Sequence, residues 1–323
     1  MAHITHFESQ DVDDQAQALN GFRQFYEQLG RGRFQGSVWQ LMMTEGFLLR
    51  ESSNRSLRQR FTPPPDHVTL AMPLAVQPGS VFAGRPLARE SLMVLSSVEE
   101  YDMVSAGEID LVGLSVHADL VQTLAPPKVE WLAQAQQRRN LPLPPDVAAA
   151  IRHMLLAVSA CAERDVASLA EGADEAALLT ATLTQAVVLA MASEGLDLVQ
   201  QIPRRADTRM KVVNRALDYM RAHLNDDIGV MEIAVAACAS RRSLQYCFEE
   251  FMHSTPQAML RALRLNEARR TLKTKGDQPI TYLANELGFA SHSHFTRHYK
   301  LMFDELPSET LKAYGINSSG HGV

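Results

Sequence analysis

Two stretches in the last third of the sequence decide the fold, SRRSLQYCF at Ser240–Phe248 and ELGFASHSHFTRHYKLMF at Glu286–Phe303. Before each of the two serines, a short apolar segment with a small alanine, Met231–Ala234 or Leu283-Ala284, leads to a break, and the serine then opens a new helix. Serine suits this place because its hydroxyl accepts a hydrogen bond from an otherwise unpaired N–H of the first turn. The pattern predicts two helix-turn-helix units, each with a second helix that is free to enter a DNA major groove.

The outward positions of these two second helices carry polar side chains. Arginine can bind guanine and glutamine can bind adenine through two hydrogen bonds, while serine, threonine and histidine can serve bases or phosphates. One such helix could equally be a solvated polar face, but two in tandem around an arginine-rich helix favour DNA contact. The candidate DNA-binding residues are Ser240, Arg241, Arg242, Gln245, Tyr246, Ser291, His292, Ser293, His294, Thr296 and Arg297.

This region, about residues 210–314, resembles the AraC/XylS family of transcription regulators. The two stretches above carry the resemblance, together with LRALRLNEARRTL at Leu260–Leu272 and LPSE at Leu306–Glu309. It implies that both recognition helices enter successive major-groove segments on one DNA face, joined by the central helix. One departure is Cys238, where many members have a turn glycine; cysteine is tolerable if its φ stays negative. Another is the acidic pair Glu249-Glu250, which weakens the expected phosphate contact of the first unit.

The first 125 residues predict a β-rich domain. Strand-like runs are separated by Pro- and Gly-rich breaks, a spacing typical of a sandwich or barrel. The apolar residues Phe22, Phe25, Tyr26 and Leu29 predict a short helix before them. A looser resemblance to family members that regulate ethanolamine-utilisation operons, or quorum sensing and virulence in pseudomonads, implies a cupin-like effector domain. The predicted strands are Ser37–Thr44, Phe47–Glu51, His67–Pro73, Ser91–Leu95 and Leu111–Val116.

The predicted fold class is α+β, with a helical dimerisation segment at 126–196 and an all-α C-terminal domain at 209–323. In the former, Asp146–Ala162 and Asp174–Glu194 are apolar enough to suggest self-association as a homodimer, with packing against the sheet as the alternative. Residues 1–196 would therefore bind an effector and dimerise, and 197–208 would form a linker. The predicted C-terminal helices are Met210–His223, Val230–Ala237, Ser240–Met252, Gln257–Lys273, Tyr282–Leu287, Ser291–Phe303 and Pro307–Ala313.

Charge is divided unevenly along the chain. The net charge is −6, yet the segment from Asp207 onward carries 15 Lys and Arg against 13 Asp and Glu, and six of the eleven His. The remainder carries 16 basic residues against 24 acidic ones. A mildly basic segment attached to an acidic one is where phosphate contacts are expected.

Other function classes lack their motifs in this sequence. There is no GxSxG elbow, Walker loop, complete GxGxxG or HxH…E cluster, so we expect neither an enzyme nor a cofactor. His294 and His298 have a spacing that could bind zinc, but no HExxH accompanies them, and no metal is expected. No apolar run reaches the roughly 18–20 residues of a membrane helix. The polar N-terminus and the unpaired Cys161, Cys238 and Cys247 indicate the cytoplasm.

We expect a regulator, an activator of transcription, whose partner is promoter double-stranded DNA and whose effector is a small molecule. RNA polymerase is a candidate second partner. Trp39, Arg50, Arg58 and His67 are candidate effector contacts, although such residues usually belong to the core or the surface. A regulator controlled by a protein partner or its own abundance is the nearest alternative, and an enzyme with a DNA-binding tail is another.

Overall fold

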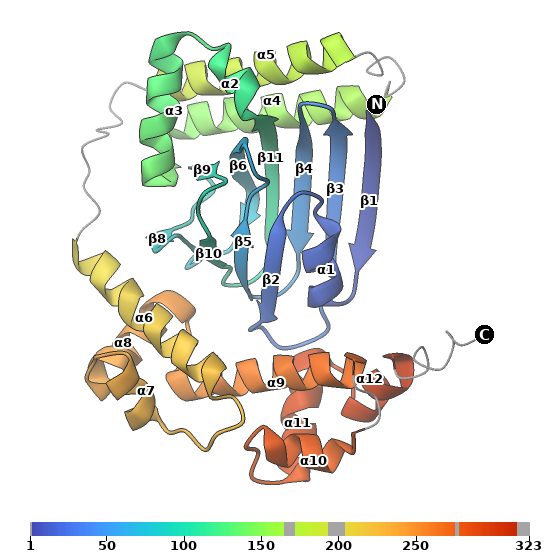
Figure 1. The fold of residues 1–323 in the computed structure, drawn as a ribbon, viewed down its shortest axis with the longest axis vertical. Coiled ribbons are helices and arrows are strands. Elements are labelled where there is room, and N and C mark those ends of the chain that lie inside the picture. The colour runs from blue at the N-terminus through green and yellow to red at the C-terminus, as the bar shows by residue number, and fades with distance from the viewer. Residues whose placement is uncertain (1, 165–171, 193–203, 275–277, 315–323) are drawn as a thin grey trace. The chain divides into compact units, whose positions relative to one another are not determined.

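The computed structural model describes residues 2–164, 172–192, 204–274 and 278–314. Its N-terminal half contains two antiparallel sheets, one of seven strands in the order β1-β3-β4-β11-β6-β9-β12 and one of five in the order β2-β5-β10-β7-β8 (Figure 1). The strands are β1 (His3–Ser9), β2 (Arg23–Gln28), β3 (Gly36–Met43), β4 (Gly46–Ser53), β5 (Leu57–Thr62), β6 (His67–Val76), β7 (Val81–Phe82), β8 (Arg85–Pro86), β9 (Ser91–Ser96), β10 (Tyr101–Val104), β11 (Ile109–His117) and β12 (Asn140–Pro142). All five predicted strands are present, and the α+β class is confirmed.

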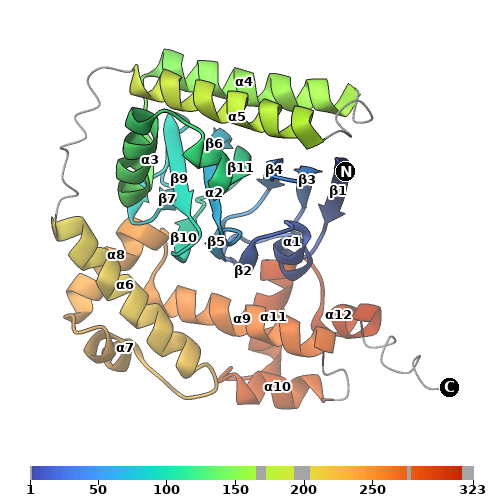
Figure 2. The same cartoon turned by 45° about the horizontal axis from the view of Figure 1, so that its top comes forward.

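Helices cover one face of the seven-stranded sheet. Two long helices, α4 (Pro145–Arg164) and α5 (Gly172–Met191), lie side by side over it in both views (Figure 2). The shorter α2 (Ala118–Gln122) and α3 (Pro126–Arg138) precede them along the chain. The predicted antiparallel helix pair is therefore present, and α3 lies within the segment 126–196 that was predicted to be helical, although no separate helix was delimited there.

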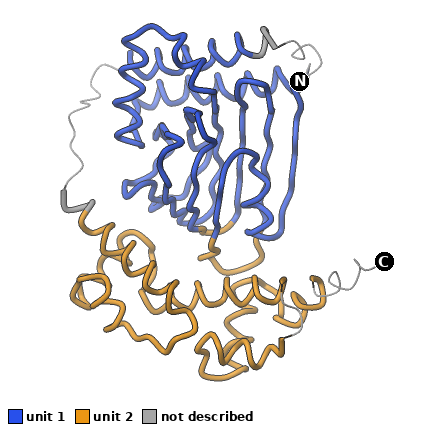
Figure 3. Tube along the Cα trace, in the orientation of Figure 1, with its two compact units in different colours: residues 1–26, 35–54, 58–201 blue, residues 27–34, 55–57, 202–323 orange. Residues whose placement is uncertain are grey.

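The chain divides into two compact units that are not continuous in sequence (Figure 3). Unit 1 comprises Met1–Tyr26, Gln35–Asn54 and Arg58–Gln201. Unit 2 comprises Ile202–Val323 together with two short segments of the N-terminal half, Glu27–Phe34 and Arg55–Leu57.

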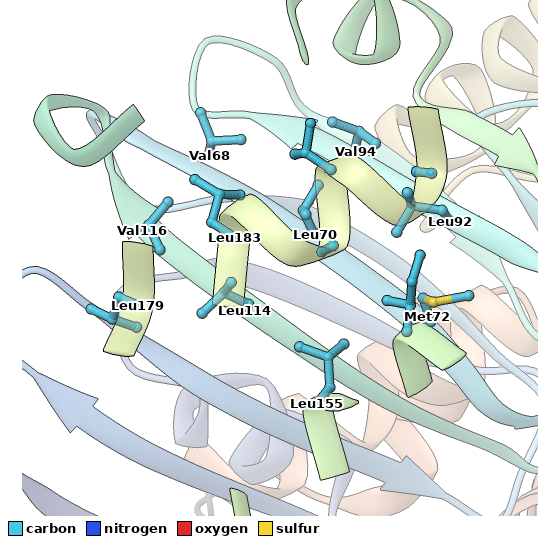
Figure 4. Packing of buried hydrophobic residues seen from close by; sticks show 14 of the residues in the cluster. Val68, Leu70, Met72, Leu92, Val94, Leu114, Val116, Leu155, Leu179 and Leu183 are labelled. Atoms are coloured by element: carbon cyan, nitrogen blue, oxygen red, sulfur yellow. The ribbon is translucent and has the colours of Figure 1, made fainter. Parts of the chain in front are cut away.

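The core of unit 1 lies between the seven-stranded sheet and the helices above it. Leucine and valine side chains of β6, β9 and β11 point toward α4 and α5 in Figure 4, which labels Val68, Leu70, Met72, Leu92, Val94, Leu114, Val116, Leu155, Leu179 and Leu183. Burying each such side chain stabilises the fold by about 1.5–3 kcal/mol. Leu155, Leu179, Leu183 and Val187, from which self-association was predicted, are fully buried here. Packing within the chain accounts for these four, and the homodimer remains a prediction.

The helix predicted through Phe22 and Leu29 is wrong. This stretch contains β2, and the first helix is instead α1 (Val12–Ala18), where the carboxylate of Asp11 accepts from the backbone N–H of Asp13 at 2.9 Å. Gly21 has φ of +87°, a left-handed conformation that a continuing right-handed helix does not contain. The apolar spacing of the four residues therefore arose from a strand and its flanking turns.

The C-terminal half is all helical within the described residues. Its helices are α6 (Arg204–Ala222), α7 (Val230–Ala236), α8 (Arg241–Met252), α9 (Pro256–Thr274), α10 (Ile280–Glu286), α11 (His292–Phe303) and α12 (Pro307–Tyr314). Six of the seven predicted helices begin and end within two residues of these bounds. The seventh, α6, begins six residues earlier than predicted, so residues 204–208 of the predicted linker are helical; residues 197–203 lie outside the described part.

Helix α4 is interrupted by Asp146 and Arg152, so it is not an apolar run of the length that the sequence was searched for. By length and mean hydropathy it could nevertheless cross a membrane. Its alanines raise that value, and Ile151 and Leu155 on one of its sides are fully buried in the unit 1 core. The same composition is found in core helices of folded domains, and one such helix is weak evidence of a membrane span.

Candidate nucleic-acid interface

Both predicted serines cap the helices that follow them. Ser240 and Ser291 have extended backbones, with ψ of 154° and 157°, which place their hydroxyls over the first turns of α8 and α11. The Ser240 hydroxyl accepts from the backbone N–H of Ser243 at 3.1 Å, and that of Ser291 from the N–H of His294 at 3.2 Å. These caps fix where each helix begins, and therefore which side chains face outward.

The inward faces of α8 and α11 are fully buried. Leu244 and Phe248 of α8 and Phe295 and Tyr299 of α11 each have no exposed surface. The preceding helices present small alanines, and Ala234 of α7 is 2% exposed. This packing holds each second helix by one side only and leaves the opposite side open to solvent.

The outward residues are where the sequence predicts them. Nine of the eleven candidate DNA-binding residues are exposed, and Gln245 and Thr296 are half-buried. Two in the first unit have neighbours on the protein: the Gln245 amide donates to the Glu249 carboxylate at 2.7 Å, and the Tyr246 ring lies 5.7 Å from the guanidinium of Arg209. Glu249 therefore competes with a base for the amide of Gln245.

The turns of the two units differ in the residue that reverses the chain. Cys238 has φ of +53° and Gly288 has φ of +68°, so both are left-handed. Each turn closes with the same kind of bond, Ala239 N to Ala234 O at 2.9 Å and Phe289 N to Ala284 O at 3.0 Å. The condition of a negative φ at Cys238 is not met. The helix-ending geometry requires the left-handed conformation whichever residue occupies the position.

A buried arginine on the central helix α9 connects the two helix-turn-helix units. The guanidinium of Arg264 on α9 donates to the carbonyls of Leu224 at 2.9 Å, Gly288 at 3.3 Å and Asp226. The first and third of these belong to the loop before α7, and the second to the turn before α11. Burial lowers the pKa of Arg264, while Asp227 and Asp226 raise it. Arg264 thus fixes the first helix-turn-helix unit against the second.

Helix α9 is arginine-rich as its sequence predicts, but two of the arginines, Arg264 and Arg269, are buried and do not belong to a polar side. Arg269 forms an ion pair with Glu305 and lies 4.9 Å from the ring of Phe303. Beside it, the Tyr299 hydroxyl bonds to that of Thr310 at 2.8 Å. This cluster holds the C-terminal end of α11 against α12, and its charges were not predictable from helical periodicity alone.

A histidine pair lies on one flank of α11. The Nε2 atoms of His294 and His298 are 3.0 Å apart. Burial lowers the pKa of His298, and the charges of Arg261, His294, Arg297 and Arg31 lower it further. Among the described residues, no group of three His, Cys, Asp or Glu is placed to hold a metal ion.

The four candidate effector residues do not converge. Trp39 and Arg50 are partners across β3 and β4, and Trp39 packs against the core that α4 and α5 cover. Arg50 is half-exposed and bonds both oxygens of Asp110, whereas Arg58 of the five-stranded sheet is buried and paired with Asp102. His67, at the start of β6, bonds the carbonyl of Pro65 at 2.7 Å.

A buried polar cluster in unit 1 escaped the sequence analysis. The Glu51 carboxylate accepts from the Tyr26 hydroxyl and from the Gln15 amide at 3.2 Å. Burial raises the pKa of Glu51, and the amide oxygens of Gln15 and Gln59 have no partner within the described residues. The available signal was Glu51 itself, an acidic residue that ends the apolar run FLLRE of the predicted strand Phe47–Glu51.

Comparison with known proteins adds to this geometry. Residues 233–313 match a family model described as a helix-turn-helix domain. The chain is similar to the probable thc operon regulatory protein of Rhodococcus erythropolis, 32% identical over 103 residues, which are 31% of either chain. It is also similar to the HTH-type transcriptional regulator ArgR of Pseudomonas aeruginosa, 29% identical over 138 residues, 42% of this chain and 41% of the relative. It covers less than half the length of either curated relative.

The chain is also similar to a solved structure, that of a probable AraC family transcriptional regulator from Rhodopseudomonas palustris. It is 30% identical, covers 32% of this chain and 96% of that one, and has a TM-score of 0.30. The matched residues 233–313 include both capping serines, the helices α8 and α11, and Arg264, which joins the two helix-turn-helix units. The chain therefore carries an AraC-type helix-turn-helix domain at residues 233–313, and its similarity to these two curated regulators covers 31% and 42% of its length.

Proposed function

We propose that this chain binds promoter DNA through both helix-turn-helix units and activates transcription under the control of a small molecule or of dimerisation. The observation that carries the proposal is the pair of serine-capped helices, α8 and α11, each buried on one side and exposed on the other. A helix held in this way can enter a major groove without loss of its own packing.

Base contact is assigned to the outward residues of both helices. Arg242 of α8 and Arg297 of α11 are exposed, and neither has an ion-pair partner among the described residues. Their guanidinium groups are therefore available to bind guanine with two hydrogen bonds. Ser240 and Ser291, as caps, place the backbone N–H groups of each first turn where a phosphate would approach.

The effector is assigned to the region 1–196, and the DNA contact to 209–323. We propose the buried cluster of Glu51, Tyr26 and Gln15 as the polar part of an effector site, in place of the four dispersed candidates. The amide oxygens of Gln15 and Gln59, which have no partner within the described residues, would accept hydrogen bonds from a ligand that carries hydroxyl or amine donors. Native mass spectrometry of the gently purified chain should detect a bound small molecule, and Glu51→Gln should abolish it.

The DNA proposal is tested on a duplex that the full chain selects from a random library. Arg242→Ala and Arg297→Ala should each weaken binding to that duplex by about 1–3 kcal/mol, with a smaller loss on a random duplex of equal length. Fluorescence anisotropy at fixed salt measures both affinities. Arg215→Ala, an exposed arginine of α6, is the matched control for the loss of one positive charge.

Two results would contradict this assignment. Equal losses on the selected and random duplexes would make the arginine a phosphate contact and not a base contact. If Arg297→Ala leaves both affinities unchanged while Arg242→Ala does not, the second unit supports the fold without contacting DNA.

Experiments on the same purified chain distinguish the rival functions. A chain that never carries a bound molecule, yet shifts promoter DNA as its concentration rises, would favour control by abundance or by a protein partner. Turnover of a small molecule by the purified chain would instead favour an enzyme with a DNA-binding tail.

A further inference from the structure

A short segment of the N-terminal half, Glu27–Phe34, is built into unit 2. The backbone N–H of Gln28 donates to the side-chain oxygen of Asn266 at 3.0 Å, and the Asn266 amide donates back to the Gln28 carbonyl at 2.9 Å. Both residues are buried, at 2% exposure each. This two-way bond attaches the segment firmly to the central helix α9.

The same segment reaches the C-terminal end of the second recognition helix. The Gln28 side chain donates to the carbonyl of Met302 at 2.7 Å, and the backbone N–H of Gly32 donates to that same carbonyl at 3.0 Å. Leu29 packs against the core that contains Phe295 and Tyr299. Residue 31, between these anchors, is therefore fixed beside α11.

Residue 31 is an exposed arginine, and its charge acts on a histidine of α11 together with the charges of two other arginines. Arg31, Arg261 of α9 and Arg297 of α11 all act on His298, whose pKa is lowered first by burial and then by these charges. None of the three arginines has an ion-pair partner within the part of the chain that the structure describes. Like charges gathered without a counter-ion repel one another, and a bound anion would relieve that repulsion.

We propose that Arg31 and Arg261 extend the DNA contact of α11 by binding one backbone phosphate beside His298. The proposal rests on the proposed function and adds to it a contact from a segment outside the helix-turn-helix domain. A recognition helix in a major groove lies next to the DNA backbone, so the nearest anion is a phosphodiester. Arginine binds phosphate oxygens through two N–H groups. The contact strengthens binding to every sequence alike, because phosphates carry no base information.

The experiment measures the salt dependence of DNA binding by the full chain. Arg31→Ala should lower the slope of log affinity against log salt by about 0.9, and weaken binding about fivefold near 0.15 M salt, on selected and random duplexes equally. Arg31→Lys should retain most of the slope because it keeps the charge. Arg33→Ala is the matched control: it removes the same charge two residues away, and Arg33 is not among the groups that act on His298.

A second measurement tests the site without DNA. The pKa of His298, followed by NMR through its ring proton, should rise in Arg31→Ala and change less in Arg33→Ala. Added inorganic phosphate should shift the His298 resonance in the native chain and not in Arg31→Ala; a shift with phosphate but no change in the DNA slope would assign the site to a free anion and overturn the DNA contact.

The failures of the two proposals are distinguishable. If the native chain binds no duplex, the proposed function fails. If it binds DNA but Arg31→Ala and Arg33→Ala behave alike, only this inference is overturned, because the loss then reflects total charge and not a site.

Discussion

Helices α8 and α11 are built alike but charged differently. Each has twelve residues, begins after a capping serine and ends at a left-handed residue, His253 with φ of +47° or Asp304 with φ of +59°. The first carries the basic pair Arg241-Arg242 at its start and the acidic pair Glu249-Glu250 near its end. The second has no acidic residue between His292 and Phe303.

This difference indicates separate tasks for two copies of one scaffold. The acidic residues of α8 would repel phosphates along its second half, so we expect its proposed DNA contacts in its first half. Helix α11 presents Arg297 and Lys300 and lies beside Arg31 and Arg261, which suits it to phosphates along its whole length. The shared scaffold places both helices alike, and their different surface charges predict different DNA contacts for the two helix-turn-helix units.

The largest effect on stability is expected from Arg264, which joins the two helix-turn-helix units. Arg264→Ala removes hydrogen bonds to three carbonyls and should lower the free energy of unfolding by about 2–4 kcal/mol. Urea unfolding measures the loss, and hydrogen exchange should rise in both α7 and α11. Arg215→Ala on the surface of α6 is the control. Faster exchange in one unit alone would show that Arg264 does not couple them.

The turn of the second unit should tolerate no side chain. A Cβ at Gly288 would lie 2.8 Å from a guanidinium nitrogen of Arg264, and its φ of +68° is unfavourable for alanine. We expect Gly288→Ala to destabilise the protein by about 1–3 kcal/mol. Thermal or urea unfolding checks the value, and a loss near zero would mean that Arg264 can move without cost.

The turn of the first unit should respond in the opposite direction. Cys238 holds a left-handed conformation that costs a non-glycine residue about 1–2 kcal/mol, part of which glycine regains. Cys238→Gly should therefore stabilise the protein by about 0.5–1 kcal/mol. Cys238→Ala, which keeps the strain and removes the thiol, is the control. A gain in the alanine variant equal to that of glycine would assign the effect to the sulfur.

The smallest effect is a pH dependence confined to the second unit. An unfolded histidine titrates near pH 6.5, whereas burial lowers the pKa of folded His298. Between these two values the unfolded chain binds more protons, so stability decreases as pH falls through 6.5 and levels off below the folded pKa. The position that corresponds in α8 is Cys247, which does not titrate in this range.

The measurement compares urea midpoints of the native chain and His298→Gln from about pH 7.5 to about pH 5.5. The native chain should lose more stability than the variant over this interval. Identical pH profiles would show that His298 has the same proton affinity in the folded and unfolded states.

The pattern of the sequence was sufficient for elements that depend on local chemistry. Serine caps, breaks and helical periodicity predicted α8 and α11 closely, because each signal acts within a few residues of its own position. The same reasoning failed at Phe22–Leu29, where the apolar spacing fits a helix but Gly21 and the pairing of β2 favour a strand.

The charged residues of the interior required the structure. Arg264 and Arg269 looked like a polar helix face, and only their contacts with distant carbonyls and with Glu305 explain why they are buried. Glu51 likewise looked like the end of a strand, although it lies within a cluster of Tyr26 and Gln15. A charge enters a core only when partners from elsewhere in the chain satisfy it, and sequence spacing does not contain those partners.

By itself, the sequence determined that two capped helices would present polar faces, since capping and periodicity are properties of neighbouring residues. The tertiary structure decided which arginines remain outside, how Arg264 joins the two helix-turn-helix units, and that the charge of Arg31, 267 residues earlier than His298, lowers the pKa of that histidine. These depend on long-range hydrogen bonds such as that between Gln28 and Asn266, which form only when the chain has folded.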